Sequence, residues 1–387
     1  MNAPLRIVDF STHLPGPLAS HLLKEMGADV IKIENPRHGD GNRGTPPQVN
    51  GEGMFHSALN AGTRSLAVDR HSELWREVIA ASAQWADAVL VGGRVKDAQA
   101  RGLDFGTFKA ANPSIIYCSL SGYGLGGPWA DYLAHGQNVD AYAGLVPTIE
   151  GEIQPTTRAG FRTVGSTLGG VFAAMAILEA ARRKESGVTK AQFVGSSLWT
   201  AAMWWSWRDL AMLANTGEPW MDYADLGSRY SIYKTQDDRE ILLAPIERHF
   251  WVRFCAALEL PESSVRRGDW RTGTEYGKGE DFLDERRQIA LRVKERDLES
   301  WISAFTEFEI PFAPLLTMEE ARTSEHARVN GVMRNVTTSS GTVSIPAAPV
   351  FFADQEITEV VRASLPAPPR IGEHTAEVLA EFGIENS

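Results

Sequence analysis

Residues 112–128, NPSIIYCSLSGYGLGGP, decide the fold of this chain. An apolar, β-prone run at 115–120 ends abruptly in the glycine-rich segment 121–128. The run predicts a buried strand, and a glycine-rich loop lets bare backbone approach a ligand closely. Ligands of open α/β sheets bind at the carboxyl ends of the strands, so we expect the substrate here. The residues expected to contact it are Gly122, Tyr123 and Gly124.

The first 120 residues alternate strand and helix patterns. Further strands are predicted at Arg6–Phe10, Asp29–Ile33, Ser65–Val68 and Ala88–Val91. A helix over Leu18–Met26 separates the first two, with 12–17 as a loop before it. Strands separated by helices pair in parallel through right-handed crossovers. The sequence therefore predicts an α/β fold with a Rossmann-like, parallel sheet.

The pattern changes near Thr216 and predicts a second domain. Before it, helices are predicted over Gly169–Arg183 and over the tryptophan-rich stretch Ala201–Asn215, which is typical of a buried helix or a subunit interface. A β-hairpin and a helix are predicted beyond it, over 230–244 and 249–258. We expect a large domain over 1–215, a small α+β domain over 216–315, and a return segment over 316–387 that completes the large domain.

The composition excludes several classes of protein. The chain has 387 residues, 43% apolar and 22% charged, as in soluble globular proteins with room for two domains. A net charge of −11 argues against nucleic acid as a partner. No apolar run has the length of a membrane span and the amino terminus is unlike a signal peptide, so we expect a cytoplasmic protein. The two cysteines, Cys118 and Cys255, give no disulfide framework or metal spacing, and we expect no metal.

Five segments, in order along the chain, resemble the family III CoA-transferases (the CaiB/BaiF family), which include the α-methylacyl-CoA racemases. They are GPLASHLLKEMGADVIKIENPRHGDGNR (16–43), LNAGTRSLAVD (59–69), RGLDF (101–105), NPSIIYCSLSGYGLGGPW (112–129) and PPRIGEHTAEVLAEFG (368–383). The resemblance implies a Rossmann-like large domain, a small domain and two ring-like subunits that interlock as a dimer. It also implies an acyl-CoA and a carboxylic acid as substrates.

The transferases of this family use one aspartate, whose carboxylate attacks the thioester and carries the acyl group and then CoA. Ser166 occupies its place in this chain. A serine ester is too stable to return the acyl group easily, and no neighbouring base marks Ser166 as a nucleophile. As a structural residue, Ser166 fits a helix N-cap. The transferase reading therefore favours a heterodimer with an aspartate-bearing homologue, with a homodimer as the alternative.

The racemase branch removes and replaces the proton next to the thioester carbonyl with a base on each face. The resemblance places His135 at the racemase histidine and Glu247 at its supporting glutamate, while Ser166 again replaces the aspartate. Ser166 cannot accept a proton at neutral pH as a carboxylate does. His135 also fits a hydrogen-bonded loop histidine, and Glu247 fits a first-turn helix residue.

The phosphates of CoA need basic side chains and backbone N–H groups. The residues on matching segments are Arg37, Arg43, Arg64, Arg94 and Lys96. Each of these residue types alone is more often a solvated surface charge.

Three functions remain open. The first is a CoA-transferase that works as one subunit of a heteromer. The second is an α-methylacyl-CoA racemase or epimerase that uses His135 and Glu247. The third is a non-catalytic subunit that binds a CoA thioester.

Overall fold

The computed structural model describes residues 4–49, 51–219, 225–338, 341–351 and 365–385. The chain divides into two compact units, which we call unit 1 (Met1–Trp207 with Glu325–Ser387) and unit 2 (Arg208–Ser324). The domain limits expected from the sequence, after 215 and after 315, differ from this division by several residues at each junction and stay predictions.

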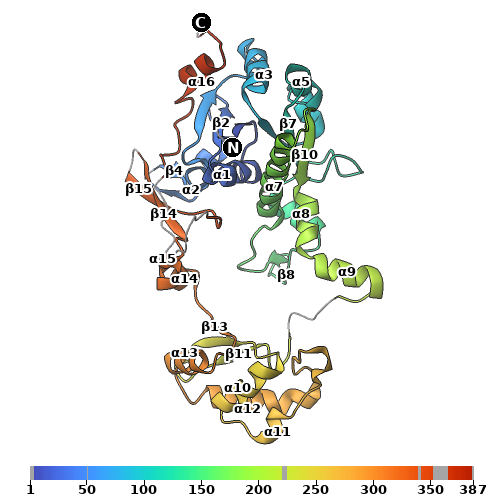
Figure 1. The fold of residues 1–387 in the computed structure, drawn as a ribbon, viewed down its shortest axis with the longest axis vertical. Helices are drawn as coiled ribbons and strands as arrows, with labels where there is room; N and C mark the ends of the chain where they lie inside the picture. Colours follow the sequence, from blue (N-terminus) through green and yellow to red (C-terminus); the bar gives the residue numbers. More distant parts are fainter. Residues whose placement is uncertain (1–3, 50, 220–224, 339–340, 352–364, 386–387) are drawn as a thin grey trace. The chain divides into compact units, whose positions relative to one another are not determined.

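Unit 1 is built on a six-stranded parallel sheet with the order β10-β7-β6-β1-β2-β5 (Figure 1). The strands are β1 (Arg6–Asp9), β2 (Asp29–Glu34), β5 (Arg64–Ala67), β6 (Ala88–Gly92), β7 (Ile116–Ser121) and β10 (Gln192–Ser197). The chain adds β2 and β5 on one side of β1, then crosses to add β6, β7 and β10 on the other. This reversal makes the β1–β6 pair the topological switch point of the sheet. The predicted α/β class is confirmed.

Helices cover both faces of this sheet. Helices α1 (Pro15–Glu25) and α7 (Gly165–Glu185) bury Leu23 and Ile177 against one face, where Cys118 lies as a small buried hydrophobe. On the other face, α3 (Leu74–Trp85), α5 (Phe105–Ala111) and α16 (Thr375–Glu381) pack against Val8 and Val89. Alternate strand residues thus serve two cores, as in a sheet buried on both sides.

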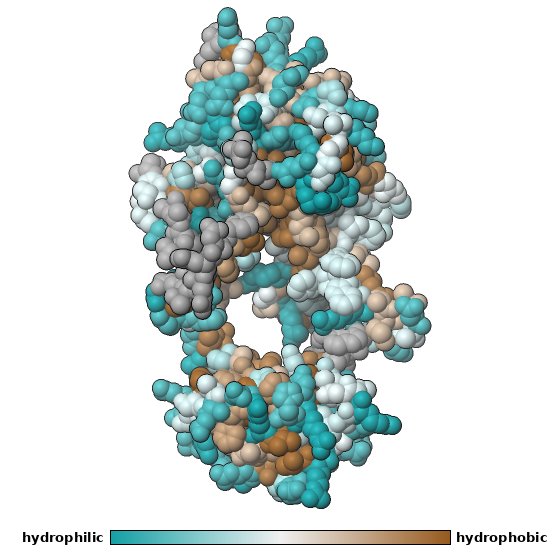
Figure 2. Space-filling model, viewed as in Figure 1, coloured by the Kyte–Doolittle hydropathy of each residue, from teal (hydrophilic) through white to brown (hydrophobic). Residues whose placement is uncertain are grey.

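Shorter elements complete unit 1. They are η1 (Gly41–Arg43), β3 (Gln48–Val49), β4 (Glu52–Gly53), α2 (Met54–Asn60), α4 (Val95–Ala100), α6 (Gly136–Tyr142), β8 (Thr148–Ile149), β9 (Thr156–Thr157), α8 (Leu198–Trp205), α15 (Glu325–Val329), β14 (Met333–Thr338) and β15 (Gly341–Pro346). Helix α9 (Trp207–Thr216) leads from unit 1 into unit 2. On the face shown in Figure 2, hydrophilic residues cover much of the upper part of unit 1 and apolar residues gather lower on it.

Unit 2 combines a small antiparallel sheet with helices. Its strands are β11 (Ser231–Lys234), β12 (Glu240–Leu243) and β13 (Phe312–Pro314), in the order β11-β12-β13. Its helices are α10 (Arg248–Ala257), α11 (Glu262–Val265), α12 (Leu283–Val293), α13 (Leu298–Glu307) and α14 (Met318–Thr323), with the one-turn helices η2 (Trp270–Thr272) and η3 (Glu280–Phe282). The predicted hairpin is present, and the aromatic core of Trp251, Phe254, Trp301 and Phe305 supports it.

Several local expectations are wrong. The stretch Ala201–Asn215 is not one helix, because the helix is interrupted at Ser206 between α8 and α9. Trp204 and Trp205 are 58% and 61% exposed, so they are not buried within the chain, and the alternative of a subunit interface stays a prediction. The loop expected over 12–17 is cut short, because proline at the first helical positions lets α1 begin at Pro15. No helix of the described residues has both the length and the apolar character to cross a membrane.

Candidate functional site

A cavity of about 480 Å³ lies in unit 1 at the carboxyl ends of β1, β6 and β7. Segments that follow these strands line it: 10–16 after β1, 92–94 after β6, and 121–122 after β7. The rest of its wall is made of Asp97, Arg101, Leu120, the segment 132–136, Thr163, Ser166 and Leu198. We call it the switch-point cavity, because it opens where ligands bind in sheets of this topology.

His135 and Ser166 both line the switch-point cavity, although they come from different elements. Ser166 lies in the first turn of α7, is 5% exposed, and its hydroxyl has no hydrogen-bond partner among the described residues. His135 is exposed and precedes α6. A Cβ added to Gly136 would lie 2.6 Å from Ser166 Oγ, so the two segments meet closely at this point. The structure therefore brings two of the three predicted catalytic residues into one cavity.

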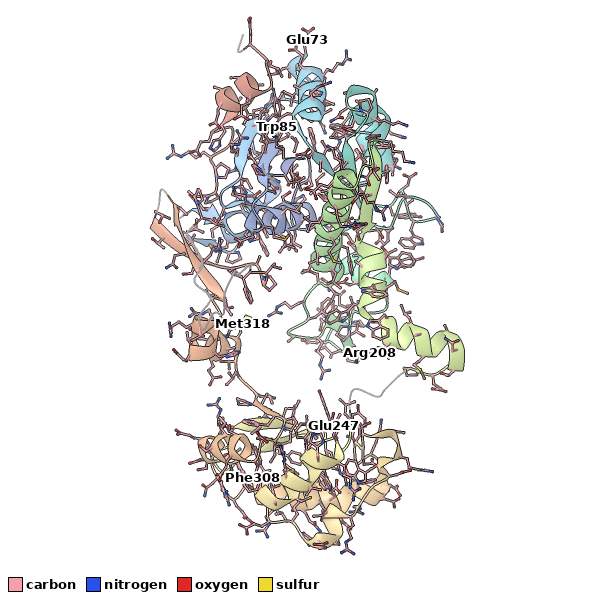
Figure 3. The ribbon with its side chains drawn as sticks, viewed as in Figure 1. Glu73, Trp85, Arg208, Glu247, Phe308 and Met318 are labelled. Carbon is pink, nitrogen blue, oxygen red and sulfur yellow. The ribbon has the colours of Figure 1, made fainter. Side chains whose placement is uncertain are left out.

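Glu247 belongs to unit 2, where it immediately precedes α10 (Figure 3). Its side chain makes no hydrogen bond to the end of that helix, so it does not serve as a side-chain cap. Its predicted support of His135 stays a prediction.

Asp140 fixes the start of α7, so the N-cap expectation for Ser166 is wrong. The N-cap position belongs to Val164, and Ser166 lies two residues inside the helix. The carboxylate of Asp140, which is 0% exposed, accepts the N–H groups of Val164 and Gly165 at 2.8 Å each. A carboxylate from a neighbouring helix thus takes over the capping role that a local serine usually has.

The glycine-rich loop after β7 contributes less to the cavity than expected. Of its predicted contact residues, only Gly122 lines the cavity, and a Cβ there would lie 2.5 Å from Ala134 Cβ. The Tyr123 ring is buried against Trp129, and Gly124 has a φ of +104°. Ser121, which the sequence did not single out, lines the cavity with a buried hydroxyl that has no partner in the described structure.

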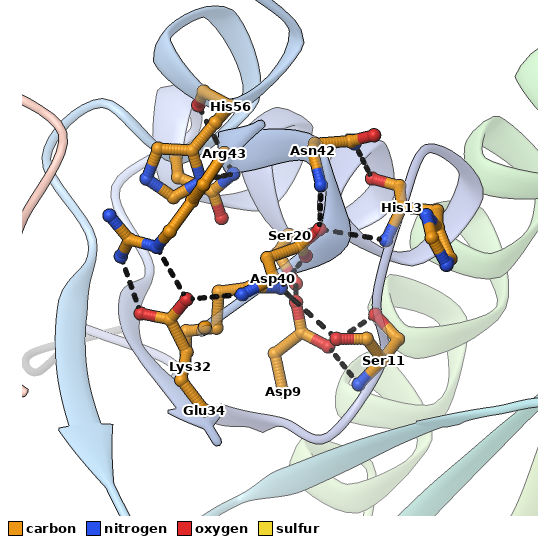
Figure 4. Close-up of polar contacts among 12 residues, drawn as sticks. Asp9, Ser11, His13, Ser20, Lys32, Glu34, Asp40, Asn42, Arg43 and His56 are labelled. Carbon is orange, nitrogen blue, oxygen red and sulfur yellow. Dashed lines mark hydrogen bonds and ion pairs between the residues drawn. The ribbon is translucent and has the colours of Figure 1, made fainter. Parts of the chain in front are cut away.

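A buried ionic network holds the two loops that follow β1 and β2 (Figure 4). Lys32 Nζ lies 2.9 Å from Asp40 Oδ2 and 3.7 Å from Asp9 Oδ2. Burial alone would raise the pKa of Asp40, but Lys32 and backbone N–H donors outweigh it and hold that pKa below its usual range. The same balance acts on Glu34, whose pKa the bidentate contact with Arg43 helps to lower.

A second cavity of about 480 Å³ adjoins the first along the same edge of the sheet. It lies beyond β2 and β5, and it shares Phe10, Thr12 and Arg101 with the switch-point cavity. Arg37 and Arg70 line it as well. We call it the basic cavity, and the two cavities are neighbours along the carboxyl ends of the strands.

Arg37, Arg70 and Arg101 have no ion pair with a carboxylate in the part of the chain that the structure describes. Burial is the largest influence on Arg101 and lowers its pKa, because nearby Asp97 offsets only part of the cost of burying the charge. An anion bound here would restore that balance. Sequence reasoning missed Arg70 and Arg101, although Arg101 opens the segment RGLDF and Arg70 directly follows 59–69.

The other predicted cations have carboxylate partners. Arg43 pairs with Glu34, Arg94 with Asp97, and Lys96 with Asp131. Arg64 contacts Asp29, Glu377 and Glu381, and its guanidinium lies 5.6 Å from the ring of Trp85. Within the described ranges, no three His, Cys, Asp or Glu side chains form a group that could hold a metal ion.

Known proteins resemble this chain over nearly its whole length. A succinate–glutarate CoA-transferase from Agrobacterium fabrum is 27% identical over 98% of this chain and 94% of its own. An acetyl-CoA:oxalate CoA-transferase from Acetobacter aceti is 25% identical over 98% of this chain and 95% of its own. Two solved structures, each 22% identical, share the fold. One is a CaiB/BaiF family protein from Brucella suis, with a TM-score of 0.76 over 98% of both chains.

The other is a Mycobacterium tuberculosis protein with one aspartate replaced by alanine, with a TM-score of 0.80 over 97% of both chains. Residues 3–375 match the sequence profile of CoA-transferase family III. The chain therefore belongs to CoA-transferase family III, a family of enzymes.

Proposed function

We propose that the chain binds an acyl-CoA thioester along the carboxyl edge of its sheet and takes part in moving CoA between carboxylic acids. The phosphates of CoA lie in the basic cavity, and the thioester lies in the switch-point cavity. One observation carries this proposal: the two cavities share Phe10, Thr12 and Arg101 in their walls, with arginines that have no carboxylate partner among the described residues in one and Ser166 with His135 in the other.

The charges in the basic cavity suit a phosphorylated ligand. Guanidinium groups bind phosphates through paired, charge-assisted hydrogen bonds. Because the whole chain carries a net charge of −11, a polyanion needs a local cluster of cations to bind. Arg37, Arg70 and Arg101 line one cavity without an ion-pair partner in the described part of the chain, and of the carboxylate residues in the same wall (Glu34, Asp40 and Asp69), Glu34 pairs with Arg43 and Asp40 with Lys32. The ion pairs of Arg43 and Arg64 instead fit a role in holding the loops and α16 in place.

The transfer chemistry needs a carboxylate that position 166 does not supply. Among the residues that line the switch-point cavity, the one carboxylate side chain is Asp97, and Arg94 occupies it through hydrogen bonds of 2.6 and 3.0 Å. We therefore propose a heterodimer in which an aspartate-bearing homologue provides the nucleophile. In its test, the chain is purified alone and with a co-expressed homologue, and both samples are assayed for CoA transfer from acetyl-CoA to a panel of carboxylates.

CoA transfer by the complex but not by the isolated chain supports the heterodimer. CoA transfer by the isolated chain contradicts the heterodimer and favours a homodimer. Tight binding of a CoA ester without turnover by either sample points to the non-catalytic role.

The binding step has its own test. Isothermal titration with CoA compares the wild type with Arg70→Gln, Arg101→Gln and the control Arg182→Gln, which changes an exposed arginine near the far end of α7. Loss of a charged hydrogen bond weakens binding by about tenfold or more. We expect this loss in the first two variants and none in the control. Equal affinity in all four proteins would contradict the assignment of the basic cavity.

A racemase or epimerase is the second candidate, because His135 and Ser166 share one cavity. Its measurement is the incorporation of deuterium from D₂O into a 2-methylacyl-CoA by the chain alone, with His135→Gln as the inactive control. Absence of exchange in the wild type would remove this candidate.

A further inference from the structure

Three aromatic rings stack beside the switch-point cavity, and we call them the aromatic stack. The Trp129 ring stacks with the ring of Tyr132, at 4.7 Å between centroids and 30° between planes, and with that of Tyr142, at 4.3 Å and 28°. The buried Tyr123 ring lies 5.3 Å from Trp129 and 5.8 Å from Tyr142. Each ring of the stack therefore has an aromatic neighbour that helps to fix its place.

Tyr132 is the member of the aromatic stack that lines the cavity. It does so together with Leu133, and these two residues are 57% and 74% exposed. Among the described residues, the one aromatic ring that contacts Tyr132 is Trp129. The Tyr132 ring is therefore stacked on one side and uncovered over much of the rest, so a ring bound in the cavity would extend the stack.

Backbone hydrogen bonds hold Tyr132 in place before any ligand binds. Its N–H donates to the Trp129 carbonyl at 3.0 Å, which closes a turn. Arg94 Nη1 donates to the carbonyl of Asp131, the preceding residue, at 3.1 Å. A ligand that stacks on Tyr132 thus meets a preorganised surface, and preorganisation reduces the entropy that binding costs.

The rest of the cavity wall favours an apolar acyl group without a second charge. Its other apolar side chains are those of Phe10, Leu14, Pro15, Leu120, Ala134 and Leu198. Its arginines are Arg94, which pairs with Asp97, and Arg101, which also lines the basic cavity. Its two imidazoles, those of His13 and His135, carry no permanent charge. Because burying an unpaired charge is costly, an acyl group with a second carboxylate fits this wall poorly.

We propose that the switch-point cavity selects an acyl group that carries an aromatic ring, and that Tyr132 and Leu133 set this specificity. The proposal rests on the acyl-CoA binding proposed above and names the kind of acyl group that binds. The acyl ring stacks on the uncovered side of Tyr132, with centroids about 4.5–7 Å apart, and Leu133 packs against its edge. The thioester keeps its place beside Ser166, so the proposal is the same whichever subunit provides the nucleophile.

Isothermal titration of the full chain with four ligands tests this specificity. They are CoA, phenylacetyl-CoA, cyclohexylacetyl-CoA, which has a saturated ring of similar size, and succinyl-CoA, which has a second carboxylate. We expect phenylacetyl-CoA to bind about tenfold or more tightly than CoA and succinyl-CoA, because it buries an apolar ring. It should also bind about threefold more tightly than cyclohexylacetyl-CoA, because only the aromatic ring stacks on Tyr132.

Variants of the two residues separate stacking from hydrophobic contact. Tyr132→Leu removes the ring and should abolish the preference for phenylacetyl-CoA over cyclohexylacetyl-CoA, whereas Tyr132→Phe should keep it. Leu133→Arg supplies a cation and should raise the affinity for succinyl-CoA relative to CoA by about tenfold. The control is Phe193→Leu, which changes a 43% exposed aromatic residue of β10 outside both cavities and should keep every wild-type affinity.

The affinity for CoA itself separates the possible failures. Unchanged affinity for CoA in both Tyr132 variants shows that they are folded. A wild type that binds CoA, but binds phenylacetyl-CoA no more tightly than CoA or succinyl-CoA, would overturn this proposal alone. A preference for the aromatic ring that survives Tyr132→Leu would overturn the role of Tyr132, and no gain for succinyl-CoA in Leu133→Arg would overturn that of Leu133. Failure of the wild type to bind CoA would overturn the proposed function as well.

Discussion

In the proposed function, position 166 carries a hydroxyl at the place where CoA transfer would need a carboxylate. Ser166 is 5% exposed and lines the switch-point cavity, where the one carboxylate side chain of the described residues, Asp97, is already paired with Arg94. Ser166→Asp adds the nucleophile. We expect it to raise CoA transfer from acetyl-CoA by about tenfold or more over Ser166→Asn, which has the same shape and a much weaker nucleophile. Equal rates for the two variants would show that the rest of the cavity has diverged from transfer chemistry.

Replacement of Lys32 should destabilise the buried ionic network. It is 1% exposed, and its ammonium group compensates the buried carboxylates of Asp9 and Asp40. Lys32→Met leaves these charges unpaired, so we expect the free energy of unfolding to fall by about 3–5 kcal/mol in urea denaturation. Adding Asp40→Asn to this variant should recover part of the loss, since it removes one of the unpaired charges. If the loss in the free energy of unfolding of the double variant equalled the sum of the losses of the two single variants, direct coupling of Lys32 and Asp40 would be contradicted.

The same network predicts how stability depends on pH. Asp40 and Glu34 have pKa values below their usual range, so the stabilisation that they provide is present above the pKa values of the unfolded chain, near 4. It is lost as the pH falls through the lower, folded-state pKa values. We expect the melting temperature to fall when the pH drops from about 5 towards 3, and to fall less in Asp40→Asn. An equal fall in both proteins would contradict the role of Asp40.

At the scale of elements, α7 depends on a cap from outside itself. Asp140→Ala removes the acceptor of the Val164 and Gly165 N–H groups and should lower the free energy of unfolding by about 1–2 kcal/mol. Asp140→Asn keeps an acceptor oxygen without the charge and should lose less. Urea denaturation of the two variants checks this order, and a larger loss for asparagine would contradict it.

Helices and strands with a strong hydrophobic periodicity were predicted correctly from the sequence. The prediction failed for elements and helix ends that depend on contacts with residues far away in the chain. The strand predicted at 115–120 lies within one residue of β7. Strand β10 was missed because QFVGSS contains a glycine and polar residues and has no apolar run. The helix over 169–183 was predicted, but its start at Gly165 depends on Asp140, which lies 25 residues earlier.

The candidate site shows the same limit. Ser166 and His135 were recognised from family segments, and the structure places both in one cavity. Whether an arginine is available for a ligand depends on its partners, and Arg64 meets Glu377 and Glu381 from the opposite end of the chain. His13 was read as an ordinary loop residue, because no local pattern reveals a φ of +67° imposed by Asp40 and Asn42.

At the scale of the whole molecule, the exposed tryptophans of α8 predict an interface between subunits. Trp204 and Trp205 are more than half exposed on unit 1, and exposed aromatic residues are typical of protein interfaces. We expect the purified chain, alone or with its homologue, to form a dimer, so light scattering should give about twice the 42.4 kDa of one chain. Trp204→Ser with Trp205→Ser should shift the mass towards the monomer. A chain that stays monomeric at high protein concentration, both by itself and when mixed with its homologue, would contradict a dimer in either form.

The most direct measurement is a crystal structure of the chain with a bound acyl-CoA. We predict the phosphates beside Arg37, Arg70 and Arg101 in the basic cavity and the thioester carbon beside Ser166 and His135 in the switch-point cavity. Electron density for the CoA ester elsewhere on the chain, or a thioester that lies outside the switch-point cavity, would contradict the account.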